Sequence, residues 1–237
     1  MPIKTAKTFT PDLTRRETIA GWVYLPIHIL VLPGLIGAAF LLFPGLPFSP
    51  AQLNGIYYLV GMVIVVLFFR KLVRREFDHL WDAPLSFLYG VVGGYMMWYL
   101  LSLLMQALFN ALGWFQDANP NNSAIDALSR DDFRVMKTIT VFFAPVLEEV
   151  LFRGVVFQSI RKKHRILAYA VSIGLFSIYH VWQYALTDPM MLWYAVQYIP
   201  VTLAITWSYE RSGTLFAPIA LHIFNNYLAF AVMQMAG

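Results

Sequence analysis

The chain lacks cysteine altogether and has few charged residues. Of its 237 residues, 13% are Asp, Glu, Lys or Arg and 59% are hydrophobic, and the mean hydropathy is +0.61. Without cysteine, the chain has no disulfide, no thiolate metal ligand and no cysteine nucleophile. A soluble domain of this size needs far more charge to cover its surface, so the composition predicts a polytopic membrane protein.

The basic residues are grouped in the way that sets membrane topology. The formal net charge is +4, but Lys and Arg occur in short clusters between apolar runs. That pattern indicates orientation in a bilayer and argues against a nucleic-acid partner. The polar, basic N-terminus leads into an apolar run with no A-x-A-like cleavage site. We therefore expect a retained first span and no signal peptide.

Seven apolar segments predict an all-α protein with about seven transmembrane helices, since about 20 residues suffice to cross the hydrocarbon core. Within the third segment, Gly90, Gly93 and Gly94 predict close helix packing or a bend. No internal repeat or low-complexity tract divides the chain, so residues 1–237 are expected to form a single membrane domain. The segments are 22–43, 52–69, 84–112, 137–160, 166–186, 189–209 and 215–235.

The distribution of Lys and Arg predicts the orientation of these segments. Three of the 17 basic residues, Arg130, Arg134 and Lys137, fall on one side, and Arg153 lies within a segment. The positive-inside rule therefore predicts a cytoplasmic N-terminus and an external C-terminus. The other thirteen lie on the N-terminal side, at positions 4–16, 70–75, 161–165 and 211.

The one sizeable external loop, 113–134, contains Asn-Pro and Asn-Asn pairs that are typical of turns. We interpret it as a solvated connector. The alternative is an interfacial helix that begins within 123–134, with Ser129 or Asp131 as its cap.

The fourth apolar segment carries three ionisable side chains, Glu148, Glu149 and Arg153. Each costs about 2.5–3.5 kcal/mol at the centre of a membrane helix on insertion scales, so such groups usually mark a functional site. Glu149 and Arg153 are four residues apart and share a helix face, so they can pair. Glu148 points about 100° away and can face a separate cavity as a general base.

Two later segments supply polar partners for these groups. His180 lies within the fifth apolar segment, and His222 and Asn226 share a face of the last one. Singly, each has an alternative role as polar packing between helices. Together with the charged groups they predict an active site in which imidazole and amide groups act as acid, base or oxyanion donor. We set His28 aside, because it is isolated on the first segment.

Three short motifs carry a resemblance to a known family. EEVLFRG at 148–154, FSIYH at 176–180 and HIFNN at 222–226 resemble, in order, the EExxxR, FxxxH and HxxxN motifs of the CPBP intramembrane proteases. This group comprises the CAAX prenyl proteases and the bacteriocin-processing, or Abi, proteins. The resemblance places the protease core at about 137–227, whereas residues 1–120 match only as generic spans.

The resemblance implies an intramembrane endopeptidase that hydrolyses peptide bonds of membrane-associated peptides or proteins. In that family's pattern, Glu148 and His180 activate a water molecule. His222 and Asn226 stabilise the oxyanion of the tetrahedral intermediate. The reaction requires that water reach the bilayer interior, so we expect a polar cavity between the segments that bear the motifs.

The resemblance also implies that Glu149 and Arg153 hold the first motif helix in place, and it leaves the cofactor open. We favour a glutamate mechanism with no metal. The alternative is zinc bound by Glu148, His180 and His222, since zinc takes three protein ligands and a water. The chain lacks HExxH, whose two His residues share one helix face.

The expected partners are the lipid bilayer and a membrane-associated polypeptide substrate. The compact chain is similar to the prokaryotic branch of the family, which implies a multi-pass protein of the prokaryotic plasma membrane. Two other functions remain open. One is a proton-coupled transporter, which usually contains internal repeats. The other is a non-catalytic bacteriocin-immunity or peptide-binding protein.

Overall fold

The described part of the chain is entirely helical. The structure is a computed structural model that describes residues 9–43, 45, 47–115 and 117–236, and no strand occurs in these ranges. The predicted all-α class is confirmed. Among the described residues, four helical stretches are long and apolar enough to cross a membrane, namely Arg15–Leu42, Pro50–Asp82, Pro84–Leu112 and Phe216–Met233. The count of seven spans stays a prediction.

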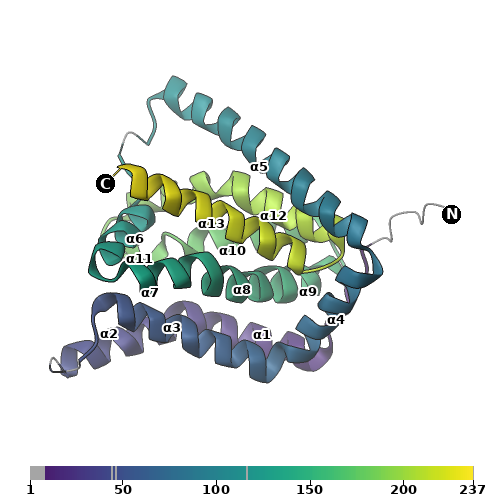
Figure 1. Cartoon of the computed structure of the whole chain (residues 1–237), viewed down its shortest axis with the longest axis horizontal. Coiled ribbons are helices and arrows are strands. Elements are labelled where there is room, and N and C mark those ends of the chain that lie inside the picture. Colours follow the sequence, from purple (N-terminus) through teal and green to yellow (C-terminus); the bar gives the residue numbers. More distant parts are fainter. Residues whose placement is uncertain (1–8, 44, 46, 116, 237) are drawn as a thin grey trace.

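Two long helical rods form one side of the bundle, at the bottom of Figure 1. Capping boxes start both: Thr14 pairs with Glu17 at the first, and Ser49 pairs with Gln52 at the second, where Pro50 occupies the first helical turn. The first rod contains α1 (Arg15–Pro26), the π-helical turn η1 (Ile27–Val31) and α2 (Leu32–Leu42); the second contains α3 (Pro50–Ile64), the π-helical η2 (Val65–Phe69) and α4 (Arg70–Asp82).

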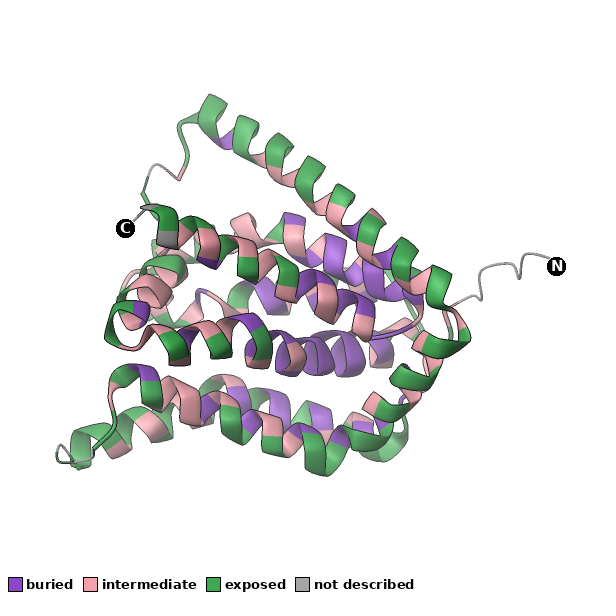
Figure 2. Ribbon diagram, viewed as in Figure 1, coloured by how far each residue is buried: buried purple, intermediate pink, exposed green. Residues whose placement is uncertain are grey.

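A buried helical run crosses the middle of the bundle and forms its core. Every residue of its π-helical stretch η4 (Val150–Phe157) is buried, and Figure 2 shows this run as the most enclosed part of the fold. Isolated π-helical turns are rare and frequently lie at functional sites. The run consists of α7 (Phe133–Thr138), the π-helical η3 (Ile139–Phe143), α8 (Ala144–Glu149), η4 and α9 (Gln158–Arg161).

The remaining helices cover the other side of this run. The predicted segments 166–186 and 189–209 are each interrupted: the first is helical only to Tyr179 before a turn, and the second begins as a 3-10 helix. Interrupted helices at membrane depth are tolerated where they line a cavity or are buried in protein. The elements are α10 (Arg165–Tyr179), α11 (Trp182–Ala185), the 3-10 helix η5 (Pro189–Tyr198), α12 (Ile199–Ser212) and α13 (Phe216–Ala236).

The long helix α5 (Pro84–Leu112) packs on α12 through glycine, as the glycine spacing predicts. A Cβ at Gly90 would lie 2.8 Å from Ser212 Cβ and 3.0 Å from the Ser208 carbonyl oxygen. We expect Gly90→Ala to destabilise the fold by about 1–3 kcal/mol, because the helix backbone must shift. Gly37→Ala is the matched control, since nothing lies within 4 Å of an added Cβ there.

The comparison requires thermal unfolding of both variants in the same detergent. A Gly90→Ala transition at or above that of Gly37→Ala would contradict the close packing of α5 on α12.

The loop at 113–134, which is predicted to be external, is more ordered than its turn signals predict. Residues 120–131 form the helix α6 (Pro120–Asp131), whose N-cap is Asn119, so the interpretation as a simple connector is wrong. The proposed caps are wrong as well, because Asp132 caps the following helix by accepting a hydrogen bond from the Val135 N–H. The Asp131 carboxylate instead accepts from the Ala51 N–H at 3.0 Å and joins the loop to α3.

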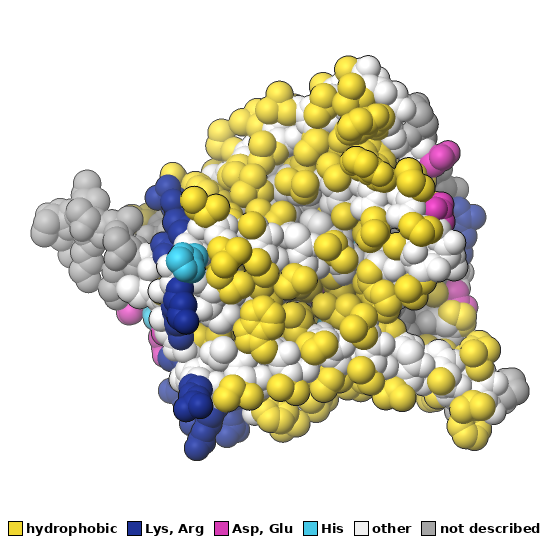
Figure 3. Space-filling model, turned by 180° about the vertical axis from the view of Figure 1, so that it is seen from behind, with side chains coloured by type: hydrophobic (Ala, Val, Ile, Leu, Met, Phe, Trp, Pro, Cys, Tyr) yellow, Lys and Arg dark blue, Asp and Glu magenta, His cyan; other side chains and the backbone are white. Residues whose placement is uncertain are grey.

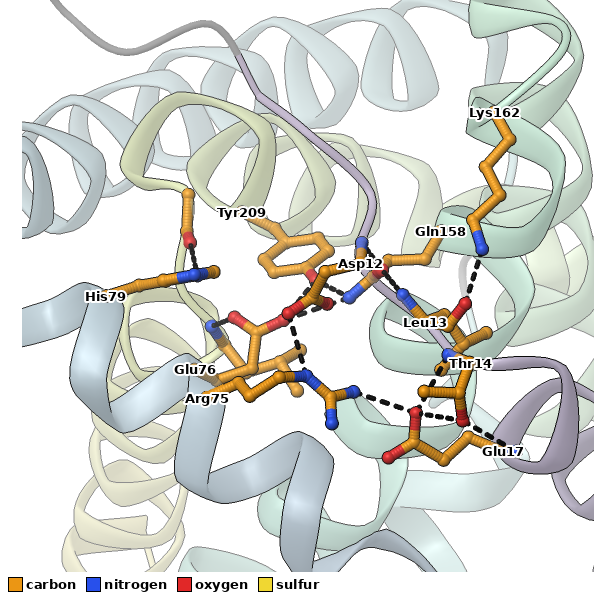
Figure 4. Close-up of polar contacts among 12 residues, drawn as sticks. Asp12, Leu13, Thr14, Glu17, Arg75, Glu76, His79, Gln158, Lys162 and Tyr209 are labelled. Carbon is orange, nitrogen blue, oxygen red and sulfur yellow. Dashed lines mark hydrogen bonds and ion pairs between the residues drawn. The ribbon is translucent and has the colours of Figure 1, made fainter.

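A polar cluster fastens the segment before α1 to the helix run that carries the first motif (Figure 4). The Gln158 carbonyl accepts hydrogen bonds from the backbone N–H groups of Asp12 and Leu13, at 3.0 and 3.1 Å. The Gln158 amide donates to Glu76 Oε1 at 2.9 Å, and the Tyr209 hydroxyl donates to the same oxygen at 2.8 Å. Four separate parts of the chain are therefore locked together at this end.

The surface divides into an apolar belt and charged ends. Figure 3 shows hydrophobic side chains over the broad middle of the molecule, while most Lys and Arg gather along one edge. That edge contains the start of α4 and the end of α9, where the clusters 70–75 and 161–165 lie. We refer to it as the basic end.

Candidate active site

The three charged groups of the first motif are buried in the central run. Glu149 and Arg153 are fully buried and form the predicted pair, with Arg153 Nη1 3.1 Å from Glu149 Oε1. Arg153 also donates to the Thr202 carbonyl at 3.2 Å and lies over the Phe176 ring at 4.5 Å. Glu148 is 3% exposed and lines a cavity that its neighbour does not reach. The two carboxylates therefore face different surroundings.

His180 is placed by the end of α10. Its Nδ1 donates to the Phe176 carbonyl oxygen at 2.9 Å, so a neutral imidazole has its lone pair on Nε2. Nε2 lies 4.0 Å from Glu148 Oε2. The ring also packs against Tyr198, with centroids 4.5 Å apart. The break after Tyr179 thus aims one basic nitrogen at Glu148.

His222 bridges the two carboxylates from α13. Its Nδ1 lies 2.8 Å from Glu149 Oε1 and its Nε2 lies 3.8 Å from Glu148 Oε2. Glu149 therefore accepts from both Arg153 and His222. The contact with Arg153 links consecutive turns of their helix, and the contact with His222 orients the imidazole. Carboxylates commonly orient a functional imidazole in this way.

Asn226 lies one turn further along α13 and lines the same cavity. One N–H of its amide donates to the Thr140 carbonyl at 2.8 Å, and its oxygen accepts from the Asn225 amide at 3.0 Å. These contacts fix the orientation of the amide and leave its second N–H for a ligand.

A single large cavity brings four of the predicted residues together, namely Glu148, His180, His222 and Asn226. Its volume is about 1010 Å³, at the upper end of the roughly 300–1,000 Å³ of small-molecule sites. Its walls come from α2, α3, α5 and α6 as well as the motif helices α8, α10 and α13. Glu149 and Arg153 lie behind the wall and support it.

Sequence reasoning missed the tyrosines around Glu148. The Tyr58 hydroxyl donates to Glu148 Oε1 at 3.4 Å and lies 3.4 Å from the Tyr179 hydroxyl. Tyr58 thus contacts one carboxylate oxygen while the imidazoles face the other. The chain contains 13 tyrosines, most within apolar runs, so residue type alone does not distinguish these two.

The described residues hold no group of three His, Asp or Glu side chains arranged as a metal site. Glu148, His180 and His222 come nearest, with Glu148 Oε2 at 4.0 and 3.8 Å from the two imidazole nitrogens. Tetrahedral zinc with bonds of about 2.1 Å needs donor atoms about 3.4 Å apart. The two separations from Glu148 Oε2 exceed that spacing by about 0.4–0.6 Å.

The geometry defines a class of site: a buried carboxylate facing two imidazoles at the wall of a cavity, in an all-helical protein with membrane-length helices. Residues 131–228 match the family described as type II CAAX prenyl endopeptidase Rce1-like. This part of the chain is similar to that family, which confirms the predicted resemblance to the CAAX-protease group. No curated protein and no solved structure matches the chain. The match supports a CAAX-type intramembrane protease function, and the apolar helices support a multi-pass membrane protein.

Proposed function

We propose that this protein is an intramembrane endopeptidase that hydrolyses peptide bonds of membrane-associated peptides or proteins by a glutamate mechanism. One observation carries the proposal: Glu148 Oε2 faces the Nε2 atoms of His180 and His222 at 4.0 and 3.8 Å on the cavity wall. Both separations exceed a direct hydrogen bond and suit a water molecule held between the groups.

The two acceptors beside this position can orient and activate the water. Glu148 Oε2 and the lone pair of His180 Nε2 each accept one O–H, which leaves the water oxygen's lone pair free to attack the scissile carbonyl carbon. Glu148 takes the proton as the new C–O bond forms. It then delivers that proton to the leaving nitrogen as the C–N bond breaks, which yields a carboxylate product and an amine.

His222 and Asn226 supply donors for the oxyanion. His222 donates Nδ1–H to Glu149, which fixes the direction of its Nε2. A proton on that Nε2 and the free N–H of Asn226 then stabilise the developing negative charge. In this mechanism Glu149 and Arg153 position His222 and touch no substrate.

A peptide-library experiment tests this function. Purified protein in liposomes is incubated with the library, with and without a chelator, and the products are read by mass spectrometry. We expect cleavage that survives the chelator. Cleavage lost with the chelator would replace the glutamate mechanism by a metal one, and flux of a solute without hydrolysis would favour a transporter.

We further propose that the cavity opens away from the cytoplasm, in a single membrane domain of the prokaryotic plasma membrane. The cavity is lined by the start of α3, by α6 and by the end of α13. Asn54 of α3 lines the cavity, and the cluster 70–75 begins at Arg70, about 24 Å further along the α3–α4 rod at 1.5 Å per residue. The positive-inside rule assigns that basic end to the cytoplasm.

Single cysteines test this orientation, because the natural chain has none. Ser123 is exposed at the cavity and Lys163 is exposed at the basic end. A membrane-impermeant maleimide should label Ser123→Cys in intact cells and Lys163→Cys only after permeabilisation. The reverse pattern would overturn the orientation and leave the hydrolytic mechanism untouched.

A further inference from the structure

We propose that His28, on the first membrane helix, is a positioning residue that fixes Glu148 through a chain of tyrosines. The inference rests on the proposed function and adds a residue outside the segment that matches the family. His28 is fully buried in the π-helical turn η1, a local structure frequently found at functional sites. It is a buried ionisable group for which the mechanism above has no use.

The side chain of His28 is held on both ring nitrogens. Nε2 lies 2.8 Å from the Tyr57 hydroxyl, and Nδ1 lies 3.4 Å from the Tyr24 hydroxyl. The Tyr57 ring stacks on the imidazole, with centroids 4.5 Å apart and planes 16° apart. The Tyr57 hydroxyl also reaches the His28 carbonyl oxygen at 3.1 Å. His28 therefore fixes the position of Tyr57.

Tyr57 is connected to the Glu148 carboxylate through two further tyrosines. Its hydroxyl lies 3.4 Å from that of Tyr179, which lies 3.4 Å from that of Tyr58. Tyr58 in turn donates to Glu148 Oε1 at 3.4 Å. The three tyrosines line the cavity, and His28 lies behind them. The chain of hydroxyls thus runs from η1 to the general base through α3 and α10.

One arrangement of protons satisfies the chain. His28 Nε2–H donates to Tyr57, Tyr57 donates to Tyr179, and Tyr179 donates to Tyr58. Tyr58 donates to Glu148, and Tyr24 donates to His28 Nδ1. Each hydroxyl then has a defined direction, as in other fully connected buried networks. The consequence at the site is that Glu148 Oε1 is occupied and Oε2 is turned toward the two imidazoles.

The test replaces His28 with residues that keep or remove the hydrogen bond. His28→Leu removes it, whereas His28→Gln keeps a polar group at the position of Nε2. We expect His28→Leu to lower kcat by about tenfold to 100-fold, the range for losing one buried hydrogen bond to a positioning group. KM should stay within about twofold because the substrate is not contacted. His28→Gln should restore most of kcat.

Two further variants separate positioning from loss of structure. Tyr58→Phe removes a single oxygen and should lower kcat to a similar extent. The double variant His28→Leu, Tyr58→Phe should be no slower than the worse single variant, because both break the same chain. Tyr169→Phe is the matched control: its hydroxyl binds Glu210 near the basic end, so kcat should stay within about twofold.

The outcomes are decisive in each direction. If the wild type does not cleave the library peptides under any condition, the proposed function fails first. If the wild type cleaves and His28→Leu or Tyr58→Phe retains full kcat, the positioning role is wrong. If the losses of the two single variants multiply in the double variant, the residues act independently and the chain is not the cause.

Discussion

Glu148→Gln is expected to abolish measurable cleavage, with a fall in kcat of about 10²–10⁴-fold, the usual contribution of a positioned general base. The amide keeps the size of the carboxylate and its contact with Tyr58, but it cannot take a proton from water. Glu148 is buried, so removing its charge should leave the unfolding temperature unchanged or higher. Initial rates and thermal unfolding in the same detergent measure both quantities.

Asp126→Asn is the matched control, since it neutralises a second carboxylate that lines the same cavity. Asp126 is partly exposed and forms an ion pair with Arg130 at 2.9 Å. Its carboxylate is therefore engaged away from His180 and His222. Its kcat should stay within about twofold of the wild type. A Glu148→Gln protein that is folded and cleaves as fast as Asp126→Asn would remove Glu148 from the chemistry.

Arg153→Met is expected to lower the free energy of unfolding by about 3–5 kcal/mol, because it leaves the Glu149 charge buried without its cation. Both side chains of the pair are 0% exposed, so solvent cannot screen the loss. The remaining partner, His222, binds the same carboxylate oxygen through a single hydrogen bond, which does not replace the guanidinium charge. Denaturant or thermal unfolding in detergent measures the change.

The double variant Glu149→Gln, Arg153→Met is the control for this prediction. It removes both charges and keeps an amide oxygen as an acceptor for His222 Nδ1–H, so most of the stability should return. The single variant Glu149→Gln completes the comparison. If the loss of stability in the double variant equalled the sum of the losses in Glu149→Gln and Arg153→Met, the buried pair would not be the source of the effect.

The charged part of the site follows from the sequence for a simple reason. Unpaired charges are costly within a membrane helix, so Glu149 and Arg153 had to find partners, and their four-residue spacing supplies one. The same geometry separates Glu148 from its neighbour. The convergence of the three motif helices is also predictable, because His180 and His222 need polar surroundings in an apolar bundle.

The supporting residues do not follow from the sequence. His28 looks isolated in the sequence because its partners, Tyr24 and Tyr57, are aromatic residues that also pack well in apolar runs. The break that presents His180 has no glycine or proline at residues 178–182, and the glycine before it, Gly174, lies within α10 without interrupting the helix. The helix at 120–131 was hidden by turn-forming Asn residues, one of which serves as its cap.

The most direct test of the account is isotope incorporation during cleavage. Wild-type and Glu148→Gln proteins in liposomes are incubated with the peptide library in ¹⁸O-labelled water, and the fragments are weighed by mass spectrometry. The account predicts fragment pairs from the wild type alone, with one ¹⁸O atom in each newly formed carboxyl group. Fragments produced equally by both proteins, or new carboxyl groups without the label, would contradict hydrolysis by water activated at Glu148.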